Sequence, residues 1–330
     1  MGDIPALLRE TSFAVVDVET TGFSPLHGDR VVEIAVVRLS ADATDEYVTL
    51  VNPLRDVGPG HIHGLTAADV AEAPMFREIV GDLLEMIDGS VMVAHNVRFD
   101  RDFVSAELSA AGVFLPAIPS LCTLELAYRL EPGLANHRLA TCCASAGLSY
   151  DGSHSALGDA RVEAELLRRY LLRAEAGGLT TLDALGCTPS LFPVGDWPHL
   201  ERSGRRTERA FGGVGVAIPY LAQVVASLGT VSSSEKLAPY LDLLDRVLED
   251  GQVTADEAEI LGTTARQWGL SMEDVVSAHH SYLESLVEAA VRDRKVTSTE
   301  RRDLEAATRL LAIDPAVMHA LLARGMEDPG

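Results

Sequence analysis

The sequence predicts an α/β domain built on five strands, followed by a linker and an all-helical bundle. Strand-like and amphipathic helical segments alternate through the first half of the chain. Gly, Pro, Ser and Arg then become frequent, and the remainder has a helical pattern throughout. We therefore place the boundaries at residues 1–180, 181–234 and 235–330. A length of 330 residues with 47% hydrophobic content suits two globular domains.

The first strand, FAVVDVETTG over residues 13–22, carries two acids on one face. Side chains alternate along a strand, so Asp17 and Glu19 project on the same side as Phe13 and Val15. Placing two like charges at positions suited to a core is costly unless a cation neutralises them. The segment is therefore interpreted as half of a divalent metal site. The alternative, on this segment alone, is a solvated edge strand with two acids by chance.

The next segments continue the sheet and begin the helices. Strands over 31–39 and 47–52 predict an antiparallel meander with the first strand. Thr66, with Asp69 as its capping-box partner, begins a short helix that Pro74 ends. An amphipathic helix over 76–87 and a short buried strand over 90–94 follow.

The second half of this domain adds two further acids. Asn96 is expected to cap a helix over 97–111, and Asp100 lies in its first turn, where the helix dipole favours an anion. A fifth strand over 118–122 precedes helices over 123–130 and 138–147. A long helix then runs from Ala156 to about 173. On one continuous helix His154 and Asp159 would be separated by about 140°, so a shared site requires His154 on the preceding loop. The segment SYDGS over residues 149–153, which includes Tyr150, predicts a polar turn and supports that position.

Three motifs in order, DVETTG, AHNVRFD and HSALGDA, contain these acids and the histidine. Their order and spacing resemble those of the DnaQ-like 3′–5′ exonucleases, the DEDDh branch of the ribonuclease-H-like superfamily, over roughly residues 12–174. The H-x-x-x-x-D spacing is typical of the histidine branch. The resemblance implies a ribonuclease-H-like exonuclease domain with a mixed five-stranded sheet, similar to the polymerase III epsilon subunit and ribonuclease T.

The resemblance also implies the roles of the site residues. Asp17, Glu19, Asp100 and Asp159 would bind two Mg²⁺ or Mn²⁺ ions, which prefer carboxylate oxygens. His154 would be the general base for the attacking water, since an unperturbed histidine titrates near pH 6.5. The expected reaction is phosphodiester hydrolysis at the 3′ ends of single-stranded DNA or RNA, releasing nucleoside 5′-monophosphates.

The same resemblance implies contacts to the terminal nucleotide from the backbone of Val18 and the side chains of Thr20 and Thr21. Weaker candidates for lining this pocket are His63, Asn96 and Phe99. Structural alternatives exist, because the threonines can simply form the turn, Asn96 can cap a helix and Phe99 can belong to the core.

Composition limits the partners and the compartment. A net charge of −22 argues against a broad duplex-binding surface, although a strand end can be gripped through metal ions. No signal sequence and no apolar run of roughly 20 residues is evident, so we expect a soluble, cytoplasmic protein without a membrane segment. The cysteines lack C-x-x-C spacing, and we expect reduced thiols.

The C-terminal half gives weaker signals. Within the linker over 181–234, the part over 187–234 is slightly basic, with a net charge of +1, and a solvated connector is favoured over attraction to nucleic acid. In the helical part, DGQVTADE and DRKVTSTE form a weak repeat with capping boxes at Thr254/Glu257 and Thr297/Glu300. This part resembles a TerB-like bundle, the fold of the tellurite-resistance family. The resemblance implies a module that binds a protein partner or regulates, with a purely stabilising bundle as the alternative.

Two other functions remain open from the sequence. One is an inactive module on the same fold that binds nucleic acid or protein. The other is a phosphohydrolase that acts on free nucleotides, which the acidic composition allows. The presence of every motif acid and of the histidine favours the exonuclease over both.

Overall fold

The computed structural model describes residues 4–58, 63–115, 118–134, 136–150, 155–187, 197–209, 237, 240–241, 243–244, 247, 255–291 and 296–327. The described residues form two compact units. The first contains residues up to 132 together with 139–209, and the second contains 133–138 and the described residues from 237 onward. Each unit is described by itself below.

The first unit is built on a five-stranded mixed sheet of order β3-β2-β1-β4-β5. β1 (Ser12–Thr20), β2 (Val31–Leu39) and β3 (Thr44–Leu50) pair in antiparallel fashion, as the meander prediction required. β4 (Ser90–Ala94) runs parallel to β1, and β5 (Ser120–Cys122) runs parallel to β4. The predicted mixed five-stranded sheet is confirmed. β3 begins earlier than predicted because its polar first residues already pair with the end of β2.

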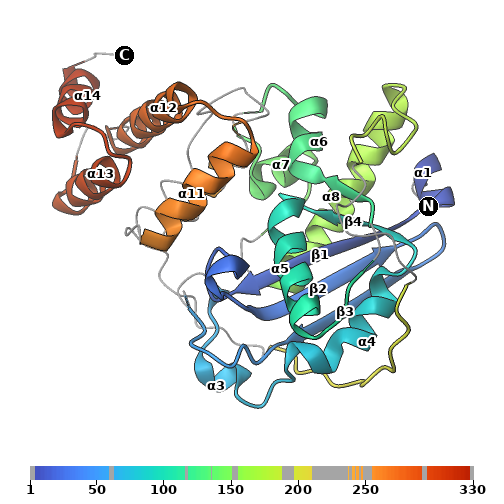
Figure 1. Ribbon diagram of the computed structural model, residues 1–330. Coiled ribbons are helices and arrows are strands. Elements are labelled where there is room, and N and C mark those ends of the chain that lie inside the picture. Colours follow the sequence, from blue (N-terminus) through green and yellow to red (C-terminus); the bar gives the residue numbers. More distant parts are fainter. Residues whose placement is uncertain are drawn as a thin grey trace. The chain divides into compact units, whose positions relative to one another are not determined.

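Helices cover both faces of this sheet (Figure 1). α4 (Phe76–Ile87) and α5 (Val97–Ala110) lie over one face, whereas α8 (Ala156–Ala176) packs along β1 and β2 on the other. The long helix predicted from Ala156 is thus confirmed. The shorter elements of the unit are α1 (Ala6–Glu10), η1 (Pro25–His27), α3 (Ala67–Val70), α6 (Thr123–Leu130) and α7 (Leu139–Ser145).

Two predicted helix starts have different outcomes. The capping box of α3 is present, since the backbone amide and hydroxyl of Thr66 both donate to Asp69 Oδ2, at 2.7 and 2.6 Å. Asn96 is the N-cap residue of α5, as predicted, but its side chain makes no capping hydrogen bond to the helix. Its backbone is left-handed, with φ 74° and ψ 56°, which asparagine tolerates better than most residues. Asn96 therefore provides the sharp turn from β4 into α5.

Residues 197–209, which we call the strap, pack against this unit although they fall within the predicted linker. In Figure 1 the yellow segment of the strap runs beside α4. The carboxylate of Asp82 on α4 accepts hydrogen bonds from the backbone amides of Ser203 and Gly204, from the Ser203 hydroxyl and from Arg202. Further along, the amide of Leu50 donates to the carbonyl of Thr207 at 2.6 Å. The strap is thus held by specific bonds rather than being only a connector.

The second unit contains α11 (Ala255–Gln267), α12 (Met272–Val291), α13 (Ser298–Leu310) and α14 (Pro315–Glu327). α12 packs against α13 and α14 around buried Tyr282 and Leu286. The predicted capping box of Thr297 and Glu300 is confirmed, whereas Thr254 lies outside the described residues. The TerB-like resemblance of this unit stays a prediction. Among the described residues, no helix has the length and apolar character needed to cross a bilayer.

Candidate active site

The two acids of the first strand lie beyond the point where the neighbouring parallel strand ends. β4 pairs with β1 only as far as Val15, opposite Val93, and the chain then turns into α5. Asp17 and Glu19 follow on β1 and are half-buried. Because α5 begins beside this end of β1, its first turn brings Asp100 toward them.

Asp159 completes a cluster of three carboxylates. It lies in the first turn of α8, where its amide bonds to the carbonyl of Ser155 at 2.9 Å. One carboxylate oxygen from each of Asp17, Glu19 and Asp159 lies within 4.8 Å of the others. Across the part of the chain that the structure describes, this is the one group of three acidic, histidine or cysteine side chains near enough to share an ion.

Asp100 lies beside this cluster but outside the group of three. Its Oδ1 accepts a hydrogen bond from the backbone amide of Val18 at 3.2 Å, and the side chain is buried. Asp100 is close enough to Asp17 for their charges to repel. The structure therefore brings all four predicted acids to one end of β1, with three in close contact and the fourth held by the strand backbone.

The electrostatics of the cluster favour a bound cation. Burial raises the pKa of Asp17 well above its ordinary value, and the charges of Asp159, Asp100 and Glu19 raise it further. A divalent ion among these carboxylates would reverse the repulsion that produces this shift. All the donors are carboxylate oxygens, the ligands that Mg²⁺ and Mn²⁺ prefer. The residues present therefore fit a hard divalent metal ion.

His154, the predicted general base, lies within residues 151–154, outside the described part of the chain, and the nearest described residues are Tyr150 before it and Ser155 after it. Before it, the hydroxyl of Tyr150 hydrogen-bonds to the Asp159 carboxylate, and burial together with the charge of Asp159 raises the pKa of Tyr150. After it, the hydroxyl of Ser155 accepts a hydrogen bond from the amide of Gly158 at 3.3 Å and caps α8. The sequence analysis placed Tyr150 in a polar turn and missed its contact with the cluster.

Glu163 is a second residue that the sequence analysis missed. It lies one turn after Asp159 on α8, is 1% exposed, and accepts a hydrogen bond from the Thr123 hydroxyl at 2.8 Å. Nδ1 of His95 bonds to the same hydroxyl at 3.0 Å. Burial raises the pKa of Glu163 to about 8, and the nearby charges of Asp100 and Asp159 contribute. The sequence offered one signal for Glu163, namely an acidic residue among the apolar side chains on the buried face of α8.

The two threonines predicted to contact a nucleotide build the turn after β1. The hydroxyl of Thr20 donates to the carbonyl of Gly22 at 2.6 Å. The hydroxyl of Thr21 donates to Asp29 at 3.1 Å and accepts from the amide of Arg30. Both side chains are buried, so their structural role is evident and their contact with a substrate stays a prediction.

The remaining pocket candidates differ in how their side chains are used. Phe99 is half-buried at the start of α5, with its ring centroid 5.0 Å from that of Phe103. The ring of His63 is 2% exposed, with Nδ1 accepting from the amide of Leu65 and Nε2 bonding to the carbonyl of Val57. The His63 ring therefore holds its own loop, whereas Phe99 presents partly accessible apolar surface.

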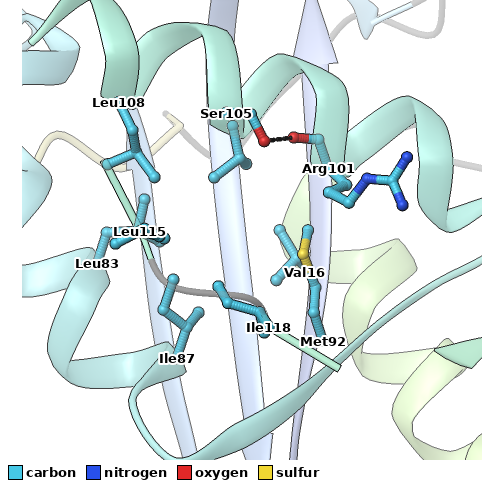
Figure 2. A pocket seen from close by; sticks show the side chains of 10 residues that line it. Val16, Leu83, Ile87, Met92, Arg101, Ser105, Leu108, Leu115 and Ile118 are labelled. Carbon is cyan, nitrogen blue, oxygen red and sulfur yellow. Dashed lines mark hydrogen bonds between the residues drawn. The ribbon is translucent and has the colours of Figure 1, made fainter. Parts of the chain in front are cut away.

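An apolar cavity lies on the other face of the sheet, as Figure 2 shows. Val16 lines this cavity, and because side chains alternate along β1 it points away from the side that carries Asp17. The hydroxyl of Ser105, in the wall of the cavity, donates a hydrogen bond to the carbonyl of Arg101 at 2.5 Å. The cavity is therefore separate from the carboxylate cluster. Its other lining residues are Leu83, Ile87, Met92, Val104, Leu108, Leu115 and Ile118.

Comparison with known proteins identifies the part of the chain that holds this site. A family model described as "Exonuclease" matches residues 14–167, a range that contains the four acids and His154. Residues 14–167 belong to this exonuclease family. The predicted resemblance to DnaQ-like exonucleases is thereby confirmed for this exonuclease domain.

Several curated proteins are similar to the exonuclease domain. One is the "3′-5′ exonuclease DinG" of Bacillus subtilis, which is 32% identical over 197 residues, covering 58% of this chain and 21% of that protein. Another is a "DNA polymerase III subunit epsilon-like protein" of Rhodobacter capsulatus, 35% identical over 185 residues, covering 54% of this chain and 26% of that protein. The chain thus spans about a quarter or less of the length of these two relatives.

A solved structure is also similar to part of this chain. It is the nuclease domain of 3′hExo, a DEDDh family member bound to rAMP, with a TM-score of 0.44 and 16% sequence identity, and the match covers 55% of this chain and 96% of that one.

Proposed function

We propose that this protein is a metal-dependent 3′–5′ exonuclease that acts on single-stranded DNA or RNA. It hydrolyses the terminal phosphodiester bond and releases nucleoside 5′-monophosphates. The observation that carries the proposal is the group of three carboxylates within 4.8 Å of one another, with Asp100 beside it, inside an exonuclease domain. The 3′–5′ direction agrees with the name of the Bacillus subtilis relative.

Asp17, Glu19, Asp100 and Asp159 would hold two Mg²⁺ or Mn²⁺ ions. When bound, such ions neutralise the phosphoryl oxygens, activate water and stabilise the leaving 3′-oxygen. The chain itself supplies the geometry, because β1 fixes two of the acids and the first turns of α5 and α8 fix the others. The bond from the Val18 amide to Asp100 sets the orientation of that carboxylate.

His154 would take a proton from the attacking water. Its neighbours support this role, since Tyr150 bonds to Asp159 and Ser155 caps the helix that carries Asp159. Tyr150 and Ser155, the nearest described residues on either side of His154, are therefore both held near Asp159. The predicted position of His154 before the start of α8 would let it approach the cluster without sharing a helix face with Asp159.

The terminal nucleotide would lie between the turn after β1 and the start of α5. Phe99 offers partly accessible aromatic surface for a base, in the manner of stacking in single-strand binding proteins. Val18, Thr20 and Thr21 would contact the nucleotide mainly through their backbone, because both threonine hydroxyls already bond within the turn. Asn96 would shape the pocket through the sharp backbone turn that it provides, and His63 through the hydrogen bonds of its ring to Val57 and Leu65.

A strand-shortening assay tests the proposal. Single-stranded DNA and RNA oligonucleotides labelled at the 5′ end are incubated with the full chain and Mg²⁺ or Mn²⁺. We expect a ladder that shortens from the 3′ end, nucleoside 5′-monophosphates as products, and no reaction with EDTA. Strand binding without cleavage would indicate an inactive binding module. Turnover of free nucleotides alone would indicate a phosphohydrolase, and either result would contradict the proposal.

A further inference from the structure

The strap is anchored on α4 by a fit that requires glycine. Gly81 lies inside α4, where a glycine costs roughly 1 kcal/mol relative to alanine. A Cβ at this position would lie 2.2 Å from the carbonyl oxygen of Glu201 and 3.2 Å from that of Leu200. The backbone of the strap therefore occupies the space of the missing side chain. The adjacent Asp82 receives the hydrogen bonds described above and is 3% exposed.

From α4 the strap passes the end of β3 and continues to a buried acid of the neighbouring strand. The amide of Thr207 donates to the hydroxyl of Thr49 at 3.0 Å, and its carbonyl accepts from the Leu50 amide. Two residues later the guanidinium of Arg209 reaches Glu33 on β2, with distances of 2.7 Å from Nη2 to Oε2 and 3.4 Å from Nε to Oε1. Nη1 of Arg209 also donates to the carbonyl of His63 at 2.5 Å.

Glu33 connects this arginine to the carboxylate cluster. It pairs with Glu19 in the register of β1 and β2, and directly paired side chains lie on the same face of a sheet. Its Oε2 also accepts a hydrogen bond from the amide of Ala156, the first residue of α8, at 3.2 Å. That amide is one of the donors that a helix start leaves without an intrahelical partner. Glu33 thus fixes the start of the helix whose first turn carries Asp159.

We propose that Arg209 is a positioning residue for the active site. It neutralises the buried Glu33 carboxylate and holds the start of α8 and the His63 loop against β2. Arg209 lies outside the segment that matches the exonuclease family, so this support comes from a part of the chain that the family match does not include. The inference rests on the proposed exonuclease function, since it concerns the geometry of the same site.

Loss of Arg209 leaves a buried negative charge without its cation. Glu33 is 1% exposed, and removing one partner of a buried ion pair is strongly destabilising because the other charge stays uncompensated. We expect Glu33 to move toward water and release the Ala156 amide. Asp159, in the first turn of α8, then loses its fixed position relative to Asp17 and Glu19. Removing groups that orient metal ligands typically costs about 10–100-fold in metal affinity or activity.

The test compares variants of the full chain on a single-stranded oligonucleotide. Arg209→Ala should lower kcat about 10–100-fold and raise the Mg²⁺ concentration for half-maximal activity, with KM for the strand changed less than about threefold. Arg205→Ala is the matched control, because Arg205 lies on the same strap and forms an ion pair with Glu78 of α4. Such exposed pairs contribute little, so Arg205→Ala should keep wild-type kcat.

A double-mutant cycle with Glu33→Gln separates positioning from general destabilisation. Glutamine keeps an acceptor for the Ala156 amide but carries no charge for Arg209 to neutralise. Arg209→Ala should therefore cost much less in the Glu33→Gln background than in the wild type. Arg209→Lys keeps a charge without the two-pronged contact and should give an intermediate kcat. If Arg209→Ala does not fold by circular dichroism, Arg209→Lys completes the same cycle.

Three results would overturn the inference. They are a wild-type kcat for Arg209→Ala, additive effects in the cycle, or a raised KM with unchanged kcat, which would indicate direct contact with substrate phosphate. The wild-type chain is assayed in parallel, so that failure of the positioning role can be distinguished from failure of the exonuclease function. An inactive wild type contradicts the exonuclease function, whereas an active wild type with an equally active Arg209→Ala variant contradicts the positioning role alone.

Discussion

The backbone amide of Val18 donates a hydrogen bond to Oδ1 of Asp100 across a separation of 82 residues in sequence. Val18 lies between the two acids of β1, so the strand that carries Asp17 and Glu19 also holds a third acid in place. Asp100 is buried and cannot turn away into solvent without breaking this bond. β1 therefore positions three of the four carboxylates, and changes on that strand should affect Asp17, Glu19 and Asp100 together.

Asp17→Asn should abolish cleavage and stabilise the metal-free protein. Activity should fall more than about 10²-fold, since metal ligation contributes several kcal/mol of transition-state stabilisation. Burial and the neighbouring acids raise the pKa of Asp17, so a neutral amide removes an unfavourable charge. An increase in the Tm of the EDTA-treated variant, by roughly 2–4 °C per kcal/mol gained, is the measurement.

The effect of added Mg²⁺ on the Tm of Asp17→Asn tests whether Asp17 binds a metal ion. Mg²⁺ should raise the Tm of the wild type, because a ligand that binds only the folded state stabilises it. It should raise the Tm of Asp17→Asn much less. Asp183→Asn, at an exposed position outside the cluster, is the control and should behave as the wild type. Equal Mg²⁺ responses in Asp17→Asn and the wild type would contradict a metal site at Asp17.

His154→Ala should lower kcat by roughly 10²–10⁴, the usual range for loss of a general base. Metal binding should persist, because the four acids are unchanged, and a Mg²⁺-induced rise in Tm would demonstrate this. His199→Ala, at an exposed position on the strap, is the matched control. A wild-type rate for His154→Ala would remove this residue from the mechanism.

Glu163 should make the metal-free protein less stable as the pH rises. Its pKa is about 8 in the folded protein and 4.5 as an ordinary glutamate, so between these values the folded state holds a proton that the unfolded state has released. The free energy of unfolding should therefore fall through this pH range, by up to about 1.4 kcal/mol per unit, with no further effect above pH 8. Denaturant titrations from pH 5 to 8 in EDTA measure this slope.

Glu163→Gln should flatten that dependence and be more stable than the wild type at pH 8. Glutamine retains an acceptor for the Thr123 hydroxyl but has no proton to lose. Glu165→Gln is the control, since that side chain is exposed on the same helix and pairs with Arg169. An unchanged slope in Glu163→Gln would assign the pH dependence to other groups.

Deleting residues 235–330 should leave activity on short oligonucleotides within about threefold of the full chain, a change of under about 1 kcal/mol in activation free energy. The four acids and the strap lie before this deletion, and the second unit supplies none of the predicted site residues. Initial rates on a short single strand, at equal protein and Mg²⁺ concentration, measure the effect. A large loss with the Tm of the first unit preserved would show that the helical unit takes part in catalysis.

The sequence was sufficient for the fold class and for the acids, for different physical reasons. Alternation along β1 predicted that Asp17 and Glu19 share a face, since a period of two is a local property. The third and fourth acids came from the motif resemblance, because nothing local indicates that the first turns of two distant helices meet at one strand. The position of His154 relative to the acids stays a prediction, as this residue lies outside the described part of the chain.

Contacts between distant segments account for what the sequence analysis missed. Glu33 and Arg209 are widely separated in the chain, and each resembles an ordinary charged residue of a strand or linker. Tyr150 was interpreted as part of a polar turn because its contact with Asp159 depends on how the loop returns to the cluster. Gly81 was the one local indication of the strap, since a glycine within an amphipathic helix suggests close approach of another backbone.

The hydrogen bond between Leu50 and Thr207 has a practical consequence for work with shorter versions of the protein. β3 is the outermost strand of the sheet on that side, and unpaired outer strands promote association between copies of a protein. A fragment ending at residue 180, the boundary that the sequence alone suggests, would leave the end of β3 uncovered and the Asp82 carboxylate without its donors. A fragment extended through residue 209 should stay monodisperse at concentrations where the shorter one aggregates.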